Sequence, residues 1–112
     1  MGLVTQGPRR GDVYLVELNP TRGQEIRKTR PCVVVSPDEL NQHLTTLLIA
    51  PLTRGGHRYP FRIPCRFQKR QGHIVLDQIR AVDAGRLLQR LGRISPTTLS
   101  STLGTLQEMF AE

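Results

Sequence analysis

The chain has 112 residues, of which 38% are apolar, and these totals suit a single globular domain spanning residues 1–112. No apolar run approaches the roughly 20 residues that a membrane-spanning helix needs. The N-terminal MGLVTQGPRR places its arginines after a short mixed segment, which is the wrong order for a secretory signal. We therefore expect a cytoplasmic protein with no membrane partner. Cys32 and Cys65 are too few for a disulfide scaffold and show no zinc-type spacing, so we expect two reduced core thiols, no metal and no cofactor.

The charge of the chain is strongly basic. Sixteen Lys and Arg residues against nine Asp and Glu give a net charge of +7. All the basic residues precede position 95, and 14 of them are arginine. The planar arginine fork binds phosphate with two hydrogen bonds and keeps its charge when partly buried. A polyanionic partner, nucleic acid first, is therefore expected, against the alternative of a basic surface that only aids solubility. Aromatic residues make up only 4% of the chain, which argues against extensive base stacking.

Five segments read as β-strands because they are rich in apolar and β-branched residues and are bounded by turn residues. They are residues 12–19, 32–36, 44–52, 58–64 and 73–79. Residues 86–94 are ambiguous and predict a short helical turn followed by a last strand near 91–94. No long helices separate the strands, so an antiparallel sheet is favoured over a parallel one. Continuous apolar runs need cover on both faces, which a small, curled, barrel-like sheet provides with a helix or a partner chain.

Two segments, 36–42 and 95–112, predict helices, and each opens on a Ser-Pro pair. In the first, Ser36 is expected to cap the helix, with Glu39 completing a capping box. The second is amphipathic and should pack on the sheet. Its apolar stripe consists of Leu99, Leu103, Leu106 and Phe110. The expected fold is therefore α+β: an antiparallel barrel-like sheet with a C-terminal helix.

Two basic loops leave the ends of predicted strands. The first, residues 20–29, carries Arg22, Arg27 and Lys28 against the single acid Glu25. The second, residues 53–60, carries Arg54, His57 and Arg58 around two glycines. A rigid sheet can hold such loops in place while they reach for a ligand. Each loop alone could be a solvated turn, but together, in a chain this basic, they predict a nucleic-acid cleft.

Arg30 follows the first loop, and Pro31 forces it into an extended conformation as a strand begins. The sequence contains no glycine-rich phosphate loop, no metal-binding carboxylate cluster and no convincing Ser/His/Asp triad. RNA supplies its own nucleophile, because its 2′-OH can attack the adjacent phosphorus; DNA has no such group. A protein then needs only to align the groups, neutralise charge and manage two protons. Arg30, Thr53 and Glu25 are available for those roles without a metal.

The segment RGDVYLVELNPTRGQEIRKTRPCVVVSP (residues 10–37) resembles the N-terminal signature of the MazF/PemK toxin family. The similarity continues through IAPLT (49–53) and VLDQIRAVD (75–83) to the terminal helix. The resemblance implies the toxin of a type II toxin–antitoxin system: a ribosome-independent, sequence-specific endoribonuclease that cleaves single-stranded RNA. It also implies a homodimer of SH3-like barrels with RNA lying across the dimer surface. The implied partner is a MazE-like antitoxin whose acidic, largely disordered tail folds over the cleft.

Carried over position by position, the resemblance assigns catalytic roles to Arg30, Thr53, Glu25 and Asp77, and places Gln78 with the RNA-binding residues. The chain departs from the family pattern at Gln24, where some members have histidine, and at Val75, where one subgroup has arginine. The identity of the general base therefore stays open among Glu25, Asp77 and Arg30.

Two non-catalytic readings compete with the nuclease. CcdB-like toxins share the barrel and trap DNA gyrase without cutting RNA, and a plain barrel could bind nucleic acid without cleaving it. The CcdB-like proteins lack the Arg-Pro pair and the strand-terminal threonine seen here as Arg30, Pro31 and Thr53. These residues favour the nuclease.

Overall fold

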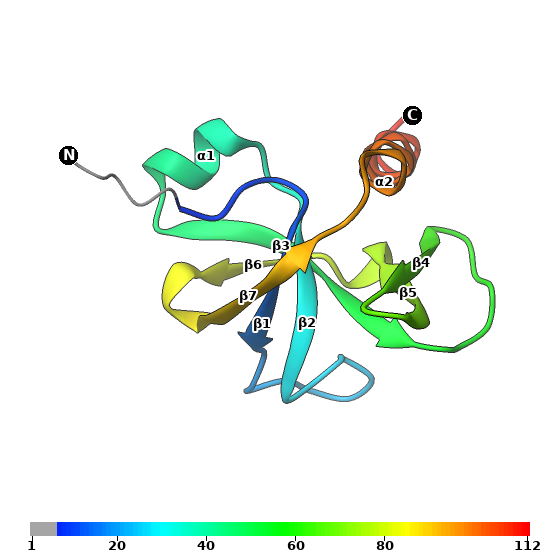
Figure 1. Cartoon of the computed structure of the whole chain (residues 1–112), viewed down its shortest axis with the longest axis horizontal. Coiled ribbons are helices and arrows are strands. Elements are labelled where there is room, and N and C mark those ends of the chain that lie inside the picture. Colours follow the sequence, from blue (N-terminus) through cyan, green and yellow to red (C-terminus); the bar gives the residue numbers. More distant parts are fainter. Residues whose placement is uncertain (1–6) are drawn as a thin grey trace.

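The structure is a computed structural model that describes residues 7–112. It contains an antiparallel sheet and two helices, which lie toward the same side of the sheet (Figure 1). The strands are β1 (Asp12–Glu17), β2 (Thr29–Val34), β3 (Thr46–Arg54), β4 (Arg62–Phe67), β5 (Arg70–Val75), β6 (Arg80–Asp83) and β7 (Leu87–Arg93). The helices are α1 (Asp38–His43) and α2 (Pro96–Met109), with short 3₁₀ helices at Leu76–Gln78 and Ala84–Arg86. The predicted α+β class with a C-terminal helix is confirmed.

The sheet curls without closing. Its strand order is β4-β5-β3-β2-β1-β7, and β6 also pairs with β3. The two ends of this order approach each other: a Cβ placed on Gly92 of β7 would lie 3.2 Å from the ring of Phe67 on β4. No ladder joins β4 to β7 among the described strands. The expected barrel is therefore an incomplete one, open along this seam.

Strand β3 is the long central strand and is shared by three others. On one side it pairs with β2, and on the other with β6 and then β5. Leu47 lies opposite Val82 and Leu52 opposite Ile74, so the six residues 47–52 of β3 face the nine residues 74–82 of the neighbouring run. The three extra residues leave the ladder as the 3₁₀ helix Leu76–Gln78. The prediction of one strand over 73–79 is therefore wrong: β5 ends at Val75, the chain turns through Leu76–Gln78, and β6 begins only at Arg80.

The core consists of two apolar clusters, one on each side of β2. Val33 and Val35 contribute to the first cluster, whereas Cys32 and Val34 contribute to the second. All four are 3% exposed or less. Alternate side chains of a strand point to opposite faces, so the continuous apolar run at 32–35 is explained by burial on both. The expected cover on both faces is confirmed.

Two further strand predictions need correction. The strand expected at 58–64 starts later, at Arg62, because Phe61 directly before it has a positive φ of 62°, which is not a strand conformation. The helical turn expected within 86–94 is shorter and earlier, at Ala84–Arg86, and β7 occupies the rest. Without β7, one edge of β1 would have unpaired backbone N–H and C=O groups. Residues 87–93 form a strand because they supply the hydrogen-bonding partners for that edge.

The first helix starts differently from the prediction. Its N-cap is Pro37 with no side-chain cap, so the capping box of Ser36 and Glu39 is wrong. The buried Ser36 hydroxyl instead donates to the side-chain oxygen of Asn41 and accepts from the backbone N–H of Leu48. A buried hydroxyl needs hydrogen-bonding partners, and Ser36 has one as a donor and one as an acceptor. These two hydrogen bonds connect α1 to β3.

The second helix starts as predicted, because the Ser95 hydroxyl accepts from the N–H of Thr98 and Pro96 occupies the first turn. Its buried stripe is shifted by one residue at the C-terminal end: Met109 packs against the core, whereas Phe110 is 74% exposed. Within residues 7–112, neither helix has the length and apolar character needed to cross a membrane. The first six residues of the segment on which the localisation prediction rests lie outside the described residues.

Candidate active site

A groove of about 830 Å³ opens where β2 and β3 separate. Their ladder ends at the pair Cys32 and Pro51, next to Pro31. Proline has no N–H to donate, so Pro31 and Pro51 cannot extend the ladder. The apolar lining of the groove consists of Leu15, Ile26, Pro31, Leu52, Cys65, Phe67 and Leu91. Its polar lining includes Glu25, Arg27, Arg30, Thr53, Arg54 and Arg70.

Arg30 and Thr53 both line the groove, one on each of the two strands that separate here. Continuing the antiparallel register by two residues beyond Cys32 and Pro51 would pair Arg30 with Thr53, and both side chains line the groove. Arg30 lies inside β2, opposite Val16, and not ahead of the strand as the sequence predicted. Its position is therefore fixed by backbone pairing while its side chain stays exposed.

The backbone around Thr53 is held tightly by β5. Thr53 lies opposite His73, and its hydroxyl is 3.5 Å from the carbonyl oxygen of that residue. The buried His73 ring donates from Nδ1 to the carbonyl oxygen of Gly55, at 2.8 Å, and so holds the start of the following loop. A Cβ on Gly72 would lie 1.8 Å from the carbonyl oxygen of Thr53, so only glycine permits this approach.

The groove carries positive charge that the described residues do not neutralise. The ion pairs among residues 7–112 lie elsewhere: Arg9–Asp38, Arg62–Asp77, Arg90–Asp12 and Arg93–Asp12. Arg27 donates only to the carbonyl oxygen of Gly23, at 3.3 Å. Within the described part of the chain, no side-chain hydrogen bond or ion pair is found for Arg30, Arg54 or Arg70. Converging cations with one nearby acid favour an anionic ligand.

Glu25 is the single carboxylate that lines the groove. One of its oxygens accepts a short hydrogen bond from the backbone N–H of Arg22, which closes a turn of the loop between β1 and β2. Gln78, at the end of the 3₁₀ helix that follows β5, anchors the same loop. Its side-chain oxygen accepts from the N–H of Ile26 at 2.7 Å, and its amide lies 3.5 Å from the carbonyl oxygen of Gln24. Gln78 therefore supports the loop rather than lining the groove.

Asp77 lies outside the groove lining. Both of its oxygens accept from Arg62, each at 2.9 Å. Hydrogen bonding to Arg62 lowers the pKa of Asp77 below its ordinary value, and the same bond raises the pKa of Arg62. The Arg62 guanidinium also lies 4.8 Å from the centre of the Tyr59 ring. A carboxylate so engaged is a weak proton acceptor.

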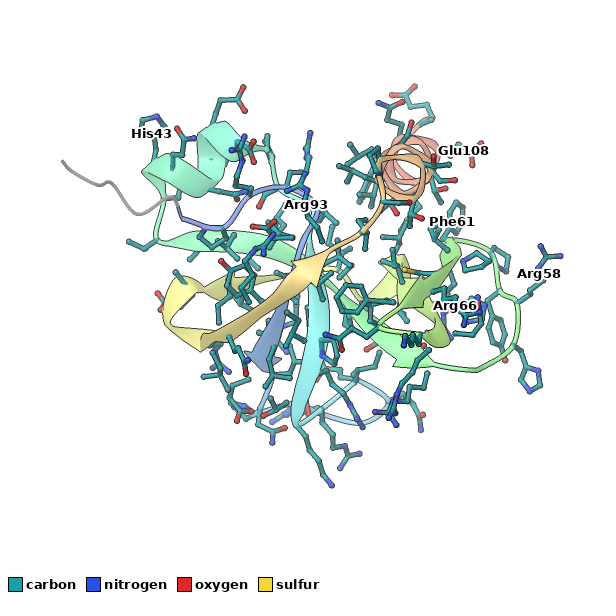
Figure 2. All side chains as sticks on the ribbon, in the orientation of Figure 1. His43, Arg58, Phe61, Arg66, Arg93 and Glu108 are labelled. Carbon is teal, nitrogen blue, oxygen red and sulfur yellow. The ribbon has the colours of Figure 1, made fainter. Side chains whose placement is uncertain are left out.

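The remaining predicted RNA contacts are exposed and lie outside the groove lining. They are Arg22, Lys28, His57 and Arg58. Figure 2 shows Arg58 projecting outward from the loop between β3 and β4. Sequence reasoning missed the contribution of the β4–β5 hairpin, which adds Phe67, Gln68 and Arg70 to the lining. The two-residue turn at Gln68 and Lys69 lacks the Asn-Gly sequence that marks such hairpins. Gly72 was the one residue in this segment whose type could have indicated a close approach of two strands.

Both cysteines are free and buried, as predicted. Burial raises the pKa of the Cys32 thiol to about 12 and also raises that of Cys65, so both thiols stay protonated at neutral pH. No group of three or more His, Cys, Asp or Glu side chains within residues 7–112 is arranged to hold a metal ion.

Fold and groove define a class: small, arginine-rich α+β proteins in which a curled antiparallel sheet holds an open cationic groove. The model for PemK-like, MazF-like toxins of type II toxin–antitoxin systems matches residues 9–110. The chain belongs to this family.

Individual relatives agree with this assignment. An endoribonuclease MazF of Staphylococcus epidermidis is 32% identical over 97 residues, which cover 81% of this chain and 81% of that protein. A solved structure of MazF from Deinococcus radiodurans has a TM-score of 0.81 at 24% identity and covers 92% of this chain and 96% of its own. A mycobacterial endoribonuclease, solved in complex with its cognate antitoxin, has a TM-score of 0.76 at 22% identity, with 90% and 92% covered. At these identities the two structures support the fold alone.

Proposed function

We propose that this toxin is a sequence-specific, ribosome-independent endoribonuclease that cuts single-stranded RNA in the groove between β2 and β3. The observation that carries the proposal is that Arg30 and Thr53 line one groove, whose arginines lack carboxylate partners among residues 7–112. Family membership and the endoribonuclease named among its relatives support the same activity.

The proposed reaction is a transesterification within RNA. The 2′-oxygen attacks the adjacent phosphorus, the bond from phosphorus to the 5′-oxygen breaks, and the products are a 2′,3′-cyclic phosphate and a 5′-OH. The Arg30 guanidinium contacts the non-bridging oxygens, where negative charge grows in the transition state, and the Thr53 hydroxyl donates to the same phosphate. Such fixed donors typically contribute about 10²- to 10³-fold in rate.

Two protons move during this reaction. One leaves the 2′-OH, and water supplies the other to the departing 5′-oxygen. Arg30 holds its own proton too tightly to accept the first, and Asp77 is engaged with Arg62. We assign the first proton to Glu25, the carboxylate that lines the groove. The bond from Arg22 uses one oxygen of Glu25, which leaves the other for the 2′-OH.

Two partners belong to the proposal. A homodimer would extend the groove across two copies, as the family resemblance implies. An antitoxin with an acidic segment would neutralise the arginines of the groove and exclude RNA from Arg30. The mycobacterial endoribonuclease solved in complex with its cognate antitoxin supports an antitoxin partner for this chain.

The test is a cleavage assay on a long single-stranded RNA in EDTA, with mapping of the new ends. We expect cyclic phosphate and 5′-OH ends, and loss of cutting in Arg30→Ala with the fold retained by circular dichroism. Arg66→Ala is the matched control, because Arg66 is an exposed arginine on β4 that does not line the groove (Figure 2). RNA that stays intact at every protein concentration would overturn the proposal in favour of a non-cleaving binder. Cutting that needs a divalent metal would overturn the metal-free mechanism.

A further inference from the structure

The β4–β5 hairpin forms one end of the groove and presents an aromatic ring beside an arginine. Phe67 and Arg70 are directly opposite each other in the hairpin register. Residues directly opposite in an antiparallel pair project from the same face. Cys65 and Gly72, the next pair on that face, also line the groove, so this face of the hairpin looks into it.

The Phe67 ring has a fixed position. Its outer edge would be 3.2 Å from a Cβ on Gly92, and its remaining surface is half-buried against the first core cluster. A rigid aromatic side chain at the edge of a cationic groove is the usual platform on which an unpaired RNA base stacks. Phe67 is also the sole aromatic residue that lines the groove within residues 7–112.

Arg70 differs from the structural arginines of the chain. Arg62, Arg90 and Arg93 are each paired with an aspartate. The exposed Arg70 side chain has no hydrogen-bond or ion-pair partner within residues 7–112, and its strand position places it opposite Phe67 at the edge of the groove. An arginine fork matches two adjacent acceptors such as guanine O6 and N7.

The turn that carries these residues is strained. Gln68 and Lys69 both adopt positive φ, at 51° and 65°, although neither is glycine or asparagine. Strained backbone of this kind persists where the surroundings determine it, and it clusters at functional sites. The turn holds Phe67 and Arg70 in register, with the Gln68 amide 3.5 Å from the carbonyl oxygen of Leu91 on β7.

We propose that Phe67 and Arg70 form a nucleobase subsite for guanine, in which the base stacks on the Phe67 ring and Arg70 donates to O6 and N7. This inference rests on the proposed RNA cleavage and adds which base is recognised, and by which side chains. The remaining groove arginines then bind phosphate, and Arg70 recognises the base.

The experiment compares the wild type with Arg70→Ala, Arg70→Lys and the control Arg66→Ala, first by mapping cut sites on a long RNA. Oligonucleotides matched to the preferred site then carry guanine, adenine or 7-deazaguanine at the conserved position. We expect guanine at that position, and a rate at the preferred site lower by about 5- to 150-fold in both Arg70 variants, the range that a bidentate base contact supports. Lysine keeps the charge and loses the fork. The 7-deaza change should slow the wild type and leave Arg70→Ala unaffected.

Each other outcome has a distinct meaning. A wild type that cuts no RNA overturns the proposed function itself. Cutting by the wild type at sites without a fixed guanine overturns the subsite, as do unchanged rates in Arg70→Ala. If Arg70→Lys behaves as wild type while Arg70→Ala slows all sequences equally, Arg70 binds phosphate and the base assignment is wrong.

Discussion

Gly72 and Thr53 are in such close contact that a Cβ on Gly72 would lie 1.8 Å from the carbonyl oxygen of Thr53 and 2.9 Å from its carbonyl carbon. Both neighbouring atoms are backbone, so neither can rotate away. The pairing of β5 with β3 at this point therefore depends on the absence of a side chain at position 72.

Gly72→Ala is accordingly expected to destabilise the fold and to displace Thr53. Overpacking of a tight site costs about 1–3 kcal/mol and sometimes more, and backbone contact places this substitution at the upper end. Urea unfolding measures the cost. The matched control is Gly104→Ala in α2, where a Cβ meets nothing within 4 Å and should stabilise the helix by about 1 kcal/mol. Equal midpoints for the two variants would contradict the close contact.

Gln78 is expected to control the loop that carries Glu25 and Arg27. Gln78→Ala leaves the part-buried N–H of Ile26 without its acceptor, at a cost of about 1 kcal/mol. We expect faster hydrogen exchange at the Ile26 amide and a drop in kcat/KM on the order of tenfold, because the loop side chains lose their position. Gln42→Ala, an exposed change on α1, is the control for removing a glutamine. Unchanged hydrogen exchange at the Ile26 amide in Gln78→Ala would contradict the anchoring role of Gln78.

The pair of Asp77 and Arg62 predicts a pH-dependent effect on stability. Arg62 lowers the pKa of Asp77, so the pair stabilises the folded state above the unfolded-state value of about 4 and loses that contribution as the pH falls through the lowered pKa. Asp77→Asn should lower the Tm at pH 7. The Asp77 side chain is 42% exposed, and solvent screening limits the loss to less than about 1 kcal/mol. The difference between variant and wild type should shrink as the pH is lowered below about 4.

Asp77→Asn also separates structure from catalysis. Because the carboxylate lies outside the groove lining, the variant should cut RNA at the wild-type rate at neutral pH. A loss of cutting on the order of 10²-fold with the fold intact would return the proton-accepting role to Asp77.

The hairpin turn at Gln68 and Lys69 should tolerate, and benefit from, residues suited to positive φ. Replacing the pair by Asn-Gly supplies the sequence that this two-residue turn prefers. Relief of two left-handed residues should raise stability by about 1 kcal/mol or more, which corresponds to a Tm increase of about 4 °C for a domain of this size. Calorimetry checks the shift. A lower Tm would show that the two side chains stabilise the turn more than their backbone strains it.

Local patterns in the sequence were enough to single out Arg30 and Thr53, which both line the groove. Each lies at the end of an apolar, β-branched run, and a proline near each end marks where pairing stops. Such signals depend only on neighbours in the chain. The two arginines of the first loop and Arg54 were likewise found from composition and loop position, although only Arg27 and Arg54 line the groove.

The residues that sequence reasoning misplaced depend on contacts between distant parts of the chain. The family resemblance assigns a catalytic role to Asp77, but its partner Arg62 lies 15 residues away across the β4–β5 hairpin and holds it outside the groove lining. Arg70 was missed because the hairpin that turns it into the groove has no typical turn sequence. The positions of Asp77 and Arg70 both depend on how the strands pair, and a local sequence pattern does not contain that information.

Glu25 gives the sharpest test of the proposed chemistry. Glu25→Gln keeps an oxygen that can accept from the N–H of Arg22, so the turn of the loop can survive the change. The amide cannot take the 2′-OH proton, and the rate of cutting should fall by about 10²- to 10⁴-fold, the usual contribution of general base catalysis. Single-turnover kinetics with RNA binding measured in parallel separate the two effects, because binding should be retained. If Glu25→Gln binds RNA and cuts it at the wild-type rate, the proton goes to water or to RNA itself, and Arg30 and Thr53 act by stabilising charge alone.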